Sequence, residues 1–355
     1  MAESLVLSID GMGGDHAPDI VVEGVDIAAR RSADTRYLIH GDEARISALL
    51  DRCPHAKAAS QIRGAEKAIG MDLKASQALR QGKGSSLWNA VQSVENGEAN
   101  AVVSAGNTGA LFAIAMFRLR KMEGIHRPAL ATRWPTMKGD YTVMLDVGAN
   151  VEADAEQLVE FAIMGEAFAR AVSGKDRPTV GLLNVGAEDQ KGHEEIRTAA
   201  RLIRETGVEM SFHGFVEGDD IAKGTVDVVV TDGFTGNIAL KTAEGVARFI
   251  SALMKEALTS SVPAKAGALL ALPALRRMRQ KIDPSAVNGG PLLGLNGIVV
   301  KSHGGADAKG YGNAIRIAVD LARSDYLKTV SDSLNRLTVV LEQPAAGSAA
   351  METPQ

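Results

Sequence analysis

A buried strand that runs into a glycine-rich turn and then into a helix is the feature that most constrains this chain's fold. Residues 226–238 read Val-Asp-Val-Val-Val-Thr-Asp-Gly-Phe-Thr-Gly-Asn-Ile, and helically spaced apolar or small residues continue to Ile250. A β-branched apolar run is typical of a strand buried on both faces of a parallel sheet. Such a turn points backbone N–H groups and a helix N-terminus at an anion, although a plain strand-to-helix connection needs the same glycines.

The same arrangement recurs five more times along the chain. Predicted strands at residues 5–9, 101–104, 142–145, 179–183 and 298–301 are each followed by a turn rich in glycine and small polar residues. Strands that alternate with helices indicate a mainly parallel sheet with helices on both faces. Because loops at the carboxyl ends of parallel strands lie together, we expect all six loops to line one small-molecule crevice.

Composition excludes several classes of protein. Aromatic residues make up only 4% of the chain and the formal net charge is −4, which argues against a general nucleic-acid binder. The single cysteine, Cys53, allows no internal disulfide, and a reducing cytosol is the expected compartment. We expect no signal peptide and no membrane span, because no run approaches roughly 18 apolar residues.

Standard phosphate and hydrolase motifs fit poorly. Residues 11–16 begin like a dinucleotide fingerprint, but His16 stands where the third glycine belongs. The chain has no P-loop and no Gly-x-Ser-x-Gly elbow. The loops nevertheless suit an anionic ligand, with Lys83 and Lys191 as full positive charges. We therefore expect catalysis to rest on positioning and electrostatics.

Six motifs together resemble the bacterial phosphate acyltransferase (PlsX) family, in order, over residues 5–335. They are Asp10-Gly-Met-Gly-Gly-Asp-His-Ala-Pro18, Ser104-Ala-Gly-Asn-Thr-Gly109, Leu145-Asp-Val-Gly-Ala-Asn150, Asn184-Val-Gly-Ala-Glu-Asp-Gln-Lys-Gly192, Asp232-Gly-Phe-Thr-Gly-Asn237 and His303-Gly-Gly-Ala-Asp307. One minor departure is Gly11, where the family is expected to have alanine.

The resemblance implies an enzyme in which inorganic phosphate attacks the thioester of an acyl chain on acyl carrier protein. The products are an acyl phosphate and the free carrier protein, for phospholipid synthesis and a downstream glycerol-3-phosphate acyltransferase. It also implies an α/β fold, a three-layer α/β/α sandwich with a mostly parallel sheet. This fold is phosphotransacetylase-related and like that of isopropylmalate and isocitrate dehydrogenases. A homodimer without cofactor or metal is expected.

Three residues are candidates for catalysis. Phosphate is already a nucleophile, so the protein must hold it and stabilise the tetrahedral oxyanion. Lys191 is the first choice for the stabilising cation, with a solvated loop lysine as the alternative. Asn237 donates two hydrogen bonds from its amide and sits at a predicted helix start, where a simple N-cap is the alternative. His193 is either an acid for the leaving thiol or a helix-start residue.

The matched loops also predict a substrate-binding set of small polar residues and glycines. The set is Asp10, Gly13, Gly14, Ser85, Ser86, Asn107, Thr108, Asp146, Asn150, Asp232, Gly236, His303 and Gly304. Asp10 and Asp232 are expected to orient loops rather than to take part in chemistry, and His303 is a ligand or a turn residue. Asp227 lies inside a predicted strand, so a metal pair with Asp232 is disfavoured.

The segment 257–282 has the composition of a membrane contact. It contains no acidic residue, and five basic residues accompany an apolar stretch at 266–275. Two helical halves broken near Pro263 and Pro273 would form an interfacial anchor on an anionic membrane. A hairpin buried in a dimer interface is the alternative. The predicted contact residues are Leu269, Leu270, Leu272, Arg276 and Arg277.

We therefore expect a single catalytic domain over residues 1–343, with a protruding helical hairpin at about 245–285 and a disordered tail at 344–355. The enzyme would be cytoplasmic and peripherally bound to the inner face of the cell membrane. Arg118, Arg120 and Lys121 are a candidate basic patch for the acidic carrier protein. Two rival functions are an NAD- and metal-dependent dehydrogenase on the same fold and a membrane-docked scaffold for the carrier protein.

Overall fold

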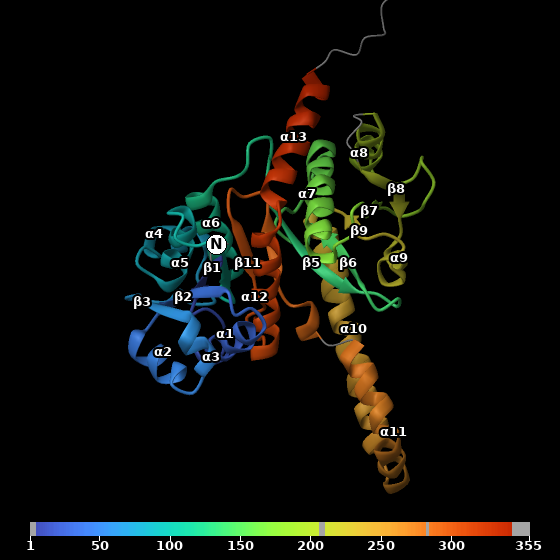
Figure 1. The fold of residues 1–355 in the computed structure, drawn as a ribbon. Helices are drawn as coiled ribbons and strands as arrows, with labels where there is room; N and C mark the ends of the chain where they lie inside the picture. Colours follow the sequence, from blue (N-terminus) through green and yellow to red (C-terminus); the bar gives the residue numbers. More distant parts are fainter. Residues whose placement is uncertain (1–4, 206–209, 282–283, 343–355) are drawn as a thin grey trace, which may run out of the picture.

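The computed structural model describes residues 5–205, 210–281 and 284–342. Within them, eleven strands form one sheet in the order β3-β2-β1-β4-β11-β10-β5-β6-β9-β7-β8 (Figure 1). The strands are β1 (Leu5–Asp10), β2 (Thr35–Gly41), β3 (Ser60–Gly64), β4 (Ala101–Ser104), β5 (Ala129–Pro135), β6 (Tyr141–Leu145), β7 (Thr179–Leu183), β8 (Ser211–Val216), β9 (Val228–Val230), β10 (Gly290–Leu293) and β11 (Ile298–Lys301).

Helices connect the strands and cover both faces of the sheet (Figure 1). They are α1 (Asp19–Arg31), α2 (Glu43–Leu50), α3 (Pro54–Ala59), α4 (Ala75–Gln81), α5 (Ser86–Glu95), α6 (Thr108–Leu119), α7 (Ala155–Ser173), α8 (Glu194–Glu205), α9 (Gly218–Lys223), α10 (Gly233–Thr259), α11 (Val262–Lys281), the 3₁₀ helix η1 (Pro284–Val287), α12 (Ala308–Arg323) and α13 (Tyr326–Glu342).

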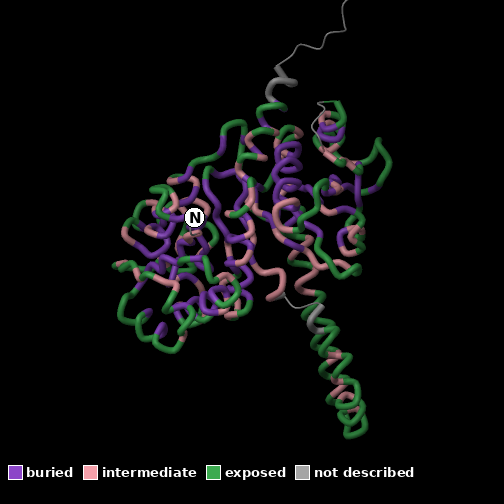
Figure 2. Tube along the Cα trace, in the orientation of Figure 1, coloured by how far each residue is buried: buried purple, intermediate pink, exposed green. Residues whose placement is uncertain are grey.

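Alternating strand residues divide the core between the two faces. Ile9, Val103 and Val300 pack with helices α1, α7 and α12, whereas Val102 and Val299 pack with α5 and α6 on the other face. Successive strand side chains point to opposite faces, so a run such as Ala101–Ser104 is buried throughout. Figure 2 shows this buried layer between exposed helical surfaces. The expected three-layer α/β/α architecture is confirmed.

Three successive antiparallel pairings reverse the strand direction between the two parallel parts of the sheet. Strand β10 runs antiparallel to both β11 and β5, and β5 runs antiparallel to β6. Strands β1, β4 and β11 are mutually parallel, as are β6, β9 and β7, but the two groups point in opposite directions. The sequence did not indicate β5, β8 or β10, so this reversal was not anticipated.

The helices α10 and α11 pack together and project away from the body of the molecule (Figure 1). The expected helix break at Pro273 is wrong: α11 continues through Pro273 to Lys281, although proline removes one backbone hydrogen bond from the helix. Pro263 lies in the first turn of α11, where proline is tolerated.

The break expected near Pro263 is confirmed, because α10 ends at Thr259 and α11 begins at Val262. No single helix among the described residues is long and apolar enough to cross a membrane, and α10 with residues 262–278 passes that test only as a pair bent by 117°. The expected tail at 344–355 lies outside the described residues.

Candidate active site

The six glycine-containing loops do not share one edge of the sheet, and this expectation is wrong. The loops after β1, β4 and β11 leave one edge, which we call the β1–β4–β11 edge. The loops after β6, β9 and β7 leave the opposite edge, which we call the β6–β9–β7 edge, because their strands run the other way. At each edge the three loops follow three adjacent strands. The chain therefore has two candidate sites.

A buried carboxylate is the centre of the β1–β4–β11 edge. Asp10 is 1% exposed, and its Oδ2 accepts a hydrogen bond of 2.7 Å from the hydroxyl of Ser104. Burial raises the pKa of Asp10, while hydrogen bonds from Ser86 and Ser104 oppose that shift. The hydroxyls hold the carboxyl group in place, as expected of a residue that orients its loop.

Lys301 is a residue at this edge that the sequence did not single out. Burial lowers the pKa of Lys301 to about 8, against the attraction of Asp10 and Asp15. Its Nζ donates to the carbonyl oxygens of Ala105, at 3.3 Å, and Ser302. A lysine that directly follows three β-branched residues and stands two residues before a matched motif was the available signal.

The glycines of this edge allow the three loops to touch backbone to backbone. A Cβ on Gly13 would lie 2.3 Å from Oδ2 of Asp10 and 2.7 Å from the amide of Gly106. Gly14 has a φ of +110°, which favours glycine. The amide of Asp15 donates to the carbonyl of Gly304 at 2.9 Å. Close packing therefore accounts for Gly13, Gly14 and Gly304.

Polar residues of the predicted binding set have structural partners here. Asn107 caps α6 by accepting from the amide of Ala110 and donates to the carbonyls of Met71 and Leu73 at 2.6 and 3.0 Å. Ser85 caps α5 by accepting from the amide of Trp88. Thr108 is exposed in the first turn of α6.

His303 also has a place in a turn. Its Nδ1 accepts from the amide of Gly305 at 3.1 Å, and its own amide donates to Oδ1 of Asn288 at 2.9 Å. The structure thus provides a turn role for His303 and leaves its role as a ligand a prediction.

At the β6–β9–β7 edge, Asp146 organises the loop that follows β6. Asp146 is fully buried, and its carboxylate accepts from the amides of Leu130 at 2.9 Å, Asn150 at 2.7 Å, Gly148 at 3.2 Å and Ala149 at 3.1 Å. Burial raises the pKa of Asp146, and these backbone donors oppose the shift. Asp146 therefore fixes the loop from within.

The start of α10 is joined directly to that loop. Asp232 is the N-cap and accepts from the amide and hydroxyl of Thr235, both at 2.8 Å. The amide of Gly233 donates to the carbonyl of Asn150 at 2.8 Å. A Cβ on Gly236 would lie only 1.9 Å from the carbonyl oxygen of Asp146, so only glycine permits this contact.

Asn237 lies in the first turn of α10 with an exposed side chain. Its Cβ and amide carbon are within 3.6 Å of where a Cβ on Gly148 would be. The alternative that Asn237 is the N-cap is wrong, because Asp232 takes that position. The Asn237 amide is therefore not used to cap α10.

Lys191 lies in the loop after β7. Its ammonium group is paired with Glu188 at 2.8 Å, and its side chain is 47% exposed. The hydrogen bond that Lys191 donates to Glu188 raises the pKa of Lys191. The Asn184 amide donates to the carbonyl of Lys191 at 3.1 Å, and His193 directly precedes α8 with its carbonyl accepting from the Arg197 amide. Because β9 lies between β6 and β7, the loops of Asp146, Asn237 and Lys191 leave three consecutive strands.

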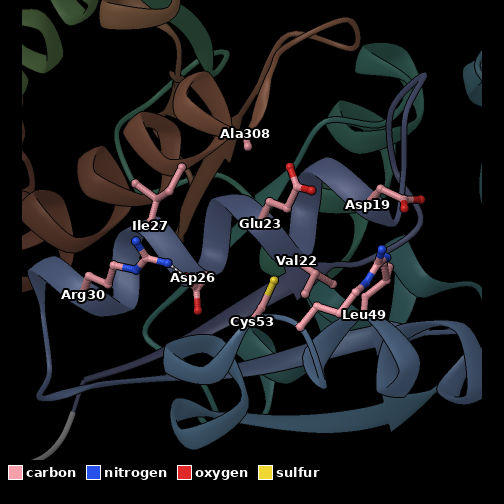
Figure 3. Close-up of a pocket in the computed structure, with 10 residues that line it drawn as sticks. Asp19, Val22, Glu23, Asp26, Ile27, Arg30, Leu49, Cys53 and Ala308 are labelled. Carbon is pink, nitrogen blue, oxygen red and sulfur yellow. Dashed lines mark hydrogen bonds and ion pairs between the residues drawn. The ribbon is translucent and has the colours of Figure 1, made fainter.

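Two cavities lie outside the β6–β9–β7 edge. One of about 290 Å³ lies among α1, α2 and the start of α12, with Cys53 in its wall (Figure 3). The other, of about 610 Å³, lies at the carboxyl ends of β1, β2 and β3 and is lined by residues including Met12, Gly41 and Lys67. Among the described residues, no group of three His, Cys, Asp or Glu side chains comes together in metal-binding geometry.

Solved structures with this fold include acyl-transferring enzymes. A phosphotransacetylase from Streptococcus pyogenes matches with a TM-score of 0.60 at 18% identity, over 91% of this chain and 95% of that one. A putative 4-hydroxythreonine-4-phosphate dehydrogenase from Salmonella typhimurium matches with a TM-score of 0.53 at 14% identity, over 90% and 99%. The fold is therefore the one that phosphotransacetylases share with this class of dehydrogenase.

Sequence kinship places the chain more narrowly. The sequence model of a family described as "Fatty acid synthesis protein" matches residues 5–329, and the chain belongs to this family. A phosphate acyltransferase from Caulobacter vibrioides is 62% identical over 95% of this chain and 94% of its own. Another, from Maricaulis maris, is 53% identical over 96% and 98%. The chain is thus an acyltransferase, as expected, and the dehydrogenase alternative is not favoured.

Proposed function

We propose that this enzyme transfers the acyl group of an acyl carrier protein thioester to inorganic phosphate. The observation that carries the proposal is the full-length kinship with phosphate acyltransferases. The products are an acyl phosphate and the free carrier protein. An acyl phosphate is an activated acyl donor. It would supply the acyl group to a glycerol-3-phosphate acyltransferase in phospholipid synthesis.

We place the chemistry at the β6–β9–β7 edge. A phosphate oxygen attacks the thioester carbonyl, a tetrahedral oxyanion forms, and the carbon–sulfur bond breaks to release a thiolate that takes up a proton. Lys191 and the Asn237 amide donate hydrogen bonds to phosphate or oxyanion, and His193 is the candidate proton donor to the thiolate. Asp146 and Asp232 fix the loop after β6 and the start of α10, which carries Asn237. Preorganised donors of this kind stabilise the transition state without reorganisation.

The reaction involves no oxidation or reduction, and we assign it no cofactor or metal. The test is a time course with purified protein, a long-chain acyl carrier protein and phosphate. Free carrier thiol and hydroxylamine-trappable acyl phosphate should appear in equal amounts and depend on phosphate. Thiol without acyl phosphate would indicate a thioesterase, and absence of both would favour the scaffold alternative. A homodimer is also proposed, to be measured by sedimentation.

We further propose that the α10–α11 hairpin contacts an anionic membrane through α11, which would make the enzyme cytoplasmic and peripheral to the inner face of the cell membrane. Leu269 and Leu270 are 71% and 85% exposed, and Leu272 is half-buried. Arg276 and Arg277, two turns further along α11, are exposed. An exposed apolar stretch with cations on the same helix is the composition of an interfacial anchor.

Replacing Leu269, Leu270 and Leu272 together with serine should release the protein from anionic vesicles. Each fully buried leucine contributes about 1.5–3 kcal/mol of transfer free energy, and each basic residue near the surface adds about 1 kcal/mol. The measurement is co-sedimentation with vesicles at moderate salt. The control is Met137→Ser, which removes an exposed apolar side chain between β5 and β6, outside the hairpin. Vesicle binding retained by the triple variant would contradict the contact.

A further inference from the structure

The sequence suggested Arg118, Arg120 and Lys121 as a basic patch for the acidic carrier protein. Arg118 is paired with Glu95, and its guanidinium lies 5.3 Å from the centre of the Trp88 ring. Lys121 donates to the carbonyl of Ile125 at 2.6 Å. Both cations have partners within their own part of the fold, whereas Arg120 is exposed, and the patch at 118–121 stays a prediction.

Helix α8 presents a second cationic surface, which we call the arginine face. Arg197, Arg201 and Arg204 recur at a spacing of four and three residues and are exposed, so they share one side of the helix. Ala199, Ala200 and Ile203 are buried on the other side. The face extends about 10 Å along the helix axis, at 1.5 Å per residue.

The arginine face is held in position and joins the loop of Lys191. Arg197 donates to the carbonyl of Gln190 at 3.2 Å, directly beside Lys191. Arg204 lies over the Phe212 ring at 5.6 Å and pairs with Asp189 at 3.3 Å. Planar guanidinium groups fixed in this way lose little freedom on binding a carboxylate. A partner seated on this face would therefore lie next to the proposed catalytic loop.

The face is also accessible. Strand β8 is the terminal strand of the sheet, and α8 lies beside it at the outer end of the molecule (Figure 1). Acidic side chains flank the face: Glu188 is paired with Lys191 and Asp189 with Arg204. Glu194 and Glu195 occupy the first turn of α8, where the helix dipole favours them, and Glu205 is exposed next to Arg204. Within these flanks, Arg197 and Arg201 align on the outer side of α8 at the approach to the site.

We propose that the arginine face of α8 docks the acidic carrier protein that delivers the acyl thioester to the β6–β9–β7 edge. The inference rests on the proposed function. Charge complementarity is the argument: carboxylates on a carrier helix would meet Arg197, Arg201 and Arg204, and attraction between opposite surfaces raises the rate of encounter. Arg201 is the residue to change, because Arg197 and Arg204 also contact the catalytic loop.

Arg201→Glu is expected to raise KM for a carrier-linked palmitoyl thioester about tenfold at low salt. KM for the palmitoyl thioester of pantetheine, which lacks the carrier protein, should stay unchanged. At high salt the KM values of wild type and Arg201→Glu for the carrier-linked thioester should become equal, since salt screens exposed charges. Arg45→Glu, an exposed arginine on α2 at the other end of the sheet, is the matched control and should change neither KM.

Equal effects on both thioesters, or none on either, would overturn the docking face. A change in sedimentation without a change in KM would also overturn it, by showing that the face joins two copies of the chain. Titration of the protein with the carrier measures docking independently of acyl transfer. Carrier binding that depends on Arg201 but without acyl transfer would support the docking face and reject the reaction.

Discussion

Lys191→Ala is expected to lower the rate of acyl phosphate formation by about 10²–10³-fold, the loss typical of removing one donor to a developing oxyanion. The fold should be unaffected. Lys191 is exposed and pairs with Glu188 on the same loop, so its removal should leave the urea midpoint of unfolding nearly unchanged. The measurements are hydroxylamine trapping of product and urea unfolding.

A matched variant separates the role of Lys191 from a general effect of charge. Lys223 on α9 is 49% exposed and paired with Asp219 at 2.6 Å, much as Lys191 is paired with Glu188. Lys223→Ala should leave turnover unchanged. A Lys191→Ala enzyme as fast as wild type would remove Lys191 from the mechanism, and comparable losses in both variants would point to a non-specific electrostatic effect.

Local signals in the sequence were sufficient to place most strands and the loops that follow them. The run Val228–Val230 and the turn after it form β9 and the start of α10, because a β-branched run and an Asp cap encode these structures locally. Ser85 caps α5 for the same reason. Such features depend on a few neighbouring residues, so they can be read from one sequence.

The division of the loops between two edges depends on long-range pairing, which local patterns do not contain. Strand β10 has four residues and begins at Gly290-Pro291, which reads as a turn. Strand β5 includes Arg133 and Trp134. Because the sequence did not indicate β5 and β10, the change of strand direction across the sheet could not be predicted. Lys301 was missed for a related reason: a strand-end lysine reads as solvated until the fold buries it beside Asp10.

Gly236→Ala is expected to disrupt both stability and activity, because it separates α10 from the Asp146 loop. The new Cβ would lie 1.9 Å from the carbonyl oxygen of Asp146 and 3.0 Å from Cγ2 of Thr231. Backbone cannot yield as a flexible side chain does, so the first turn of α10 must shift. Overpacking of this kind costs about 1–3 kcal/mol, and the shift carries Asn237, the next residue, out of place.

Gly245→Ala in the same helix is the control that separates the steric effect of this contact from the effect of alanine on helix propensity. Gly245 lies inside α10 with nothing within 4 Å of an added Cβ, so alanine there should stabilise the protein by about 0.8–1 kcal/mol. The two variants make the same chemical change in one helix and should move the urea midpoint in opposite directions. Only Gly236→Ala should slow acyl transfer. If Gly236→Ala instead matched Gly245→Ala in stability and rate, the contact between α10 and the Asp146 loop would not be what positions Asn237.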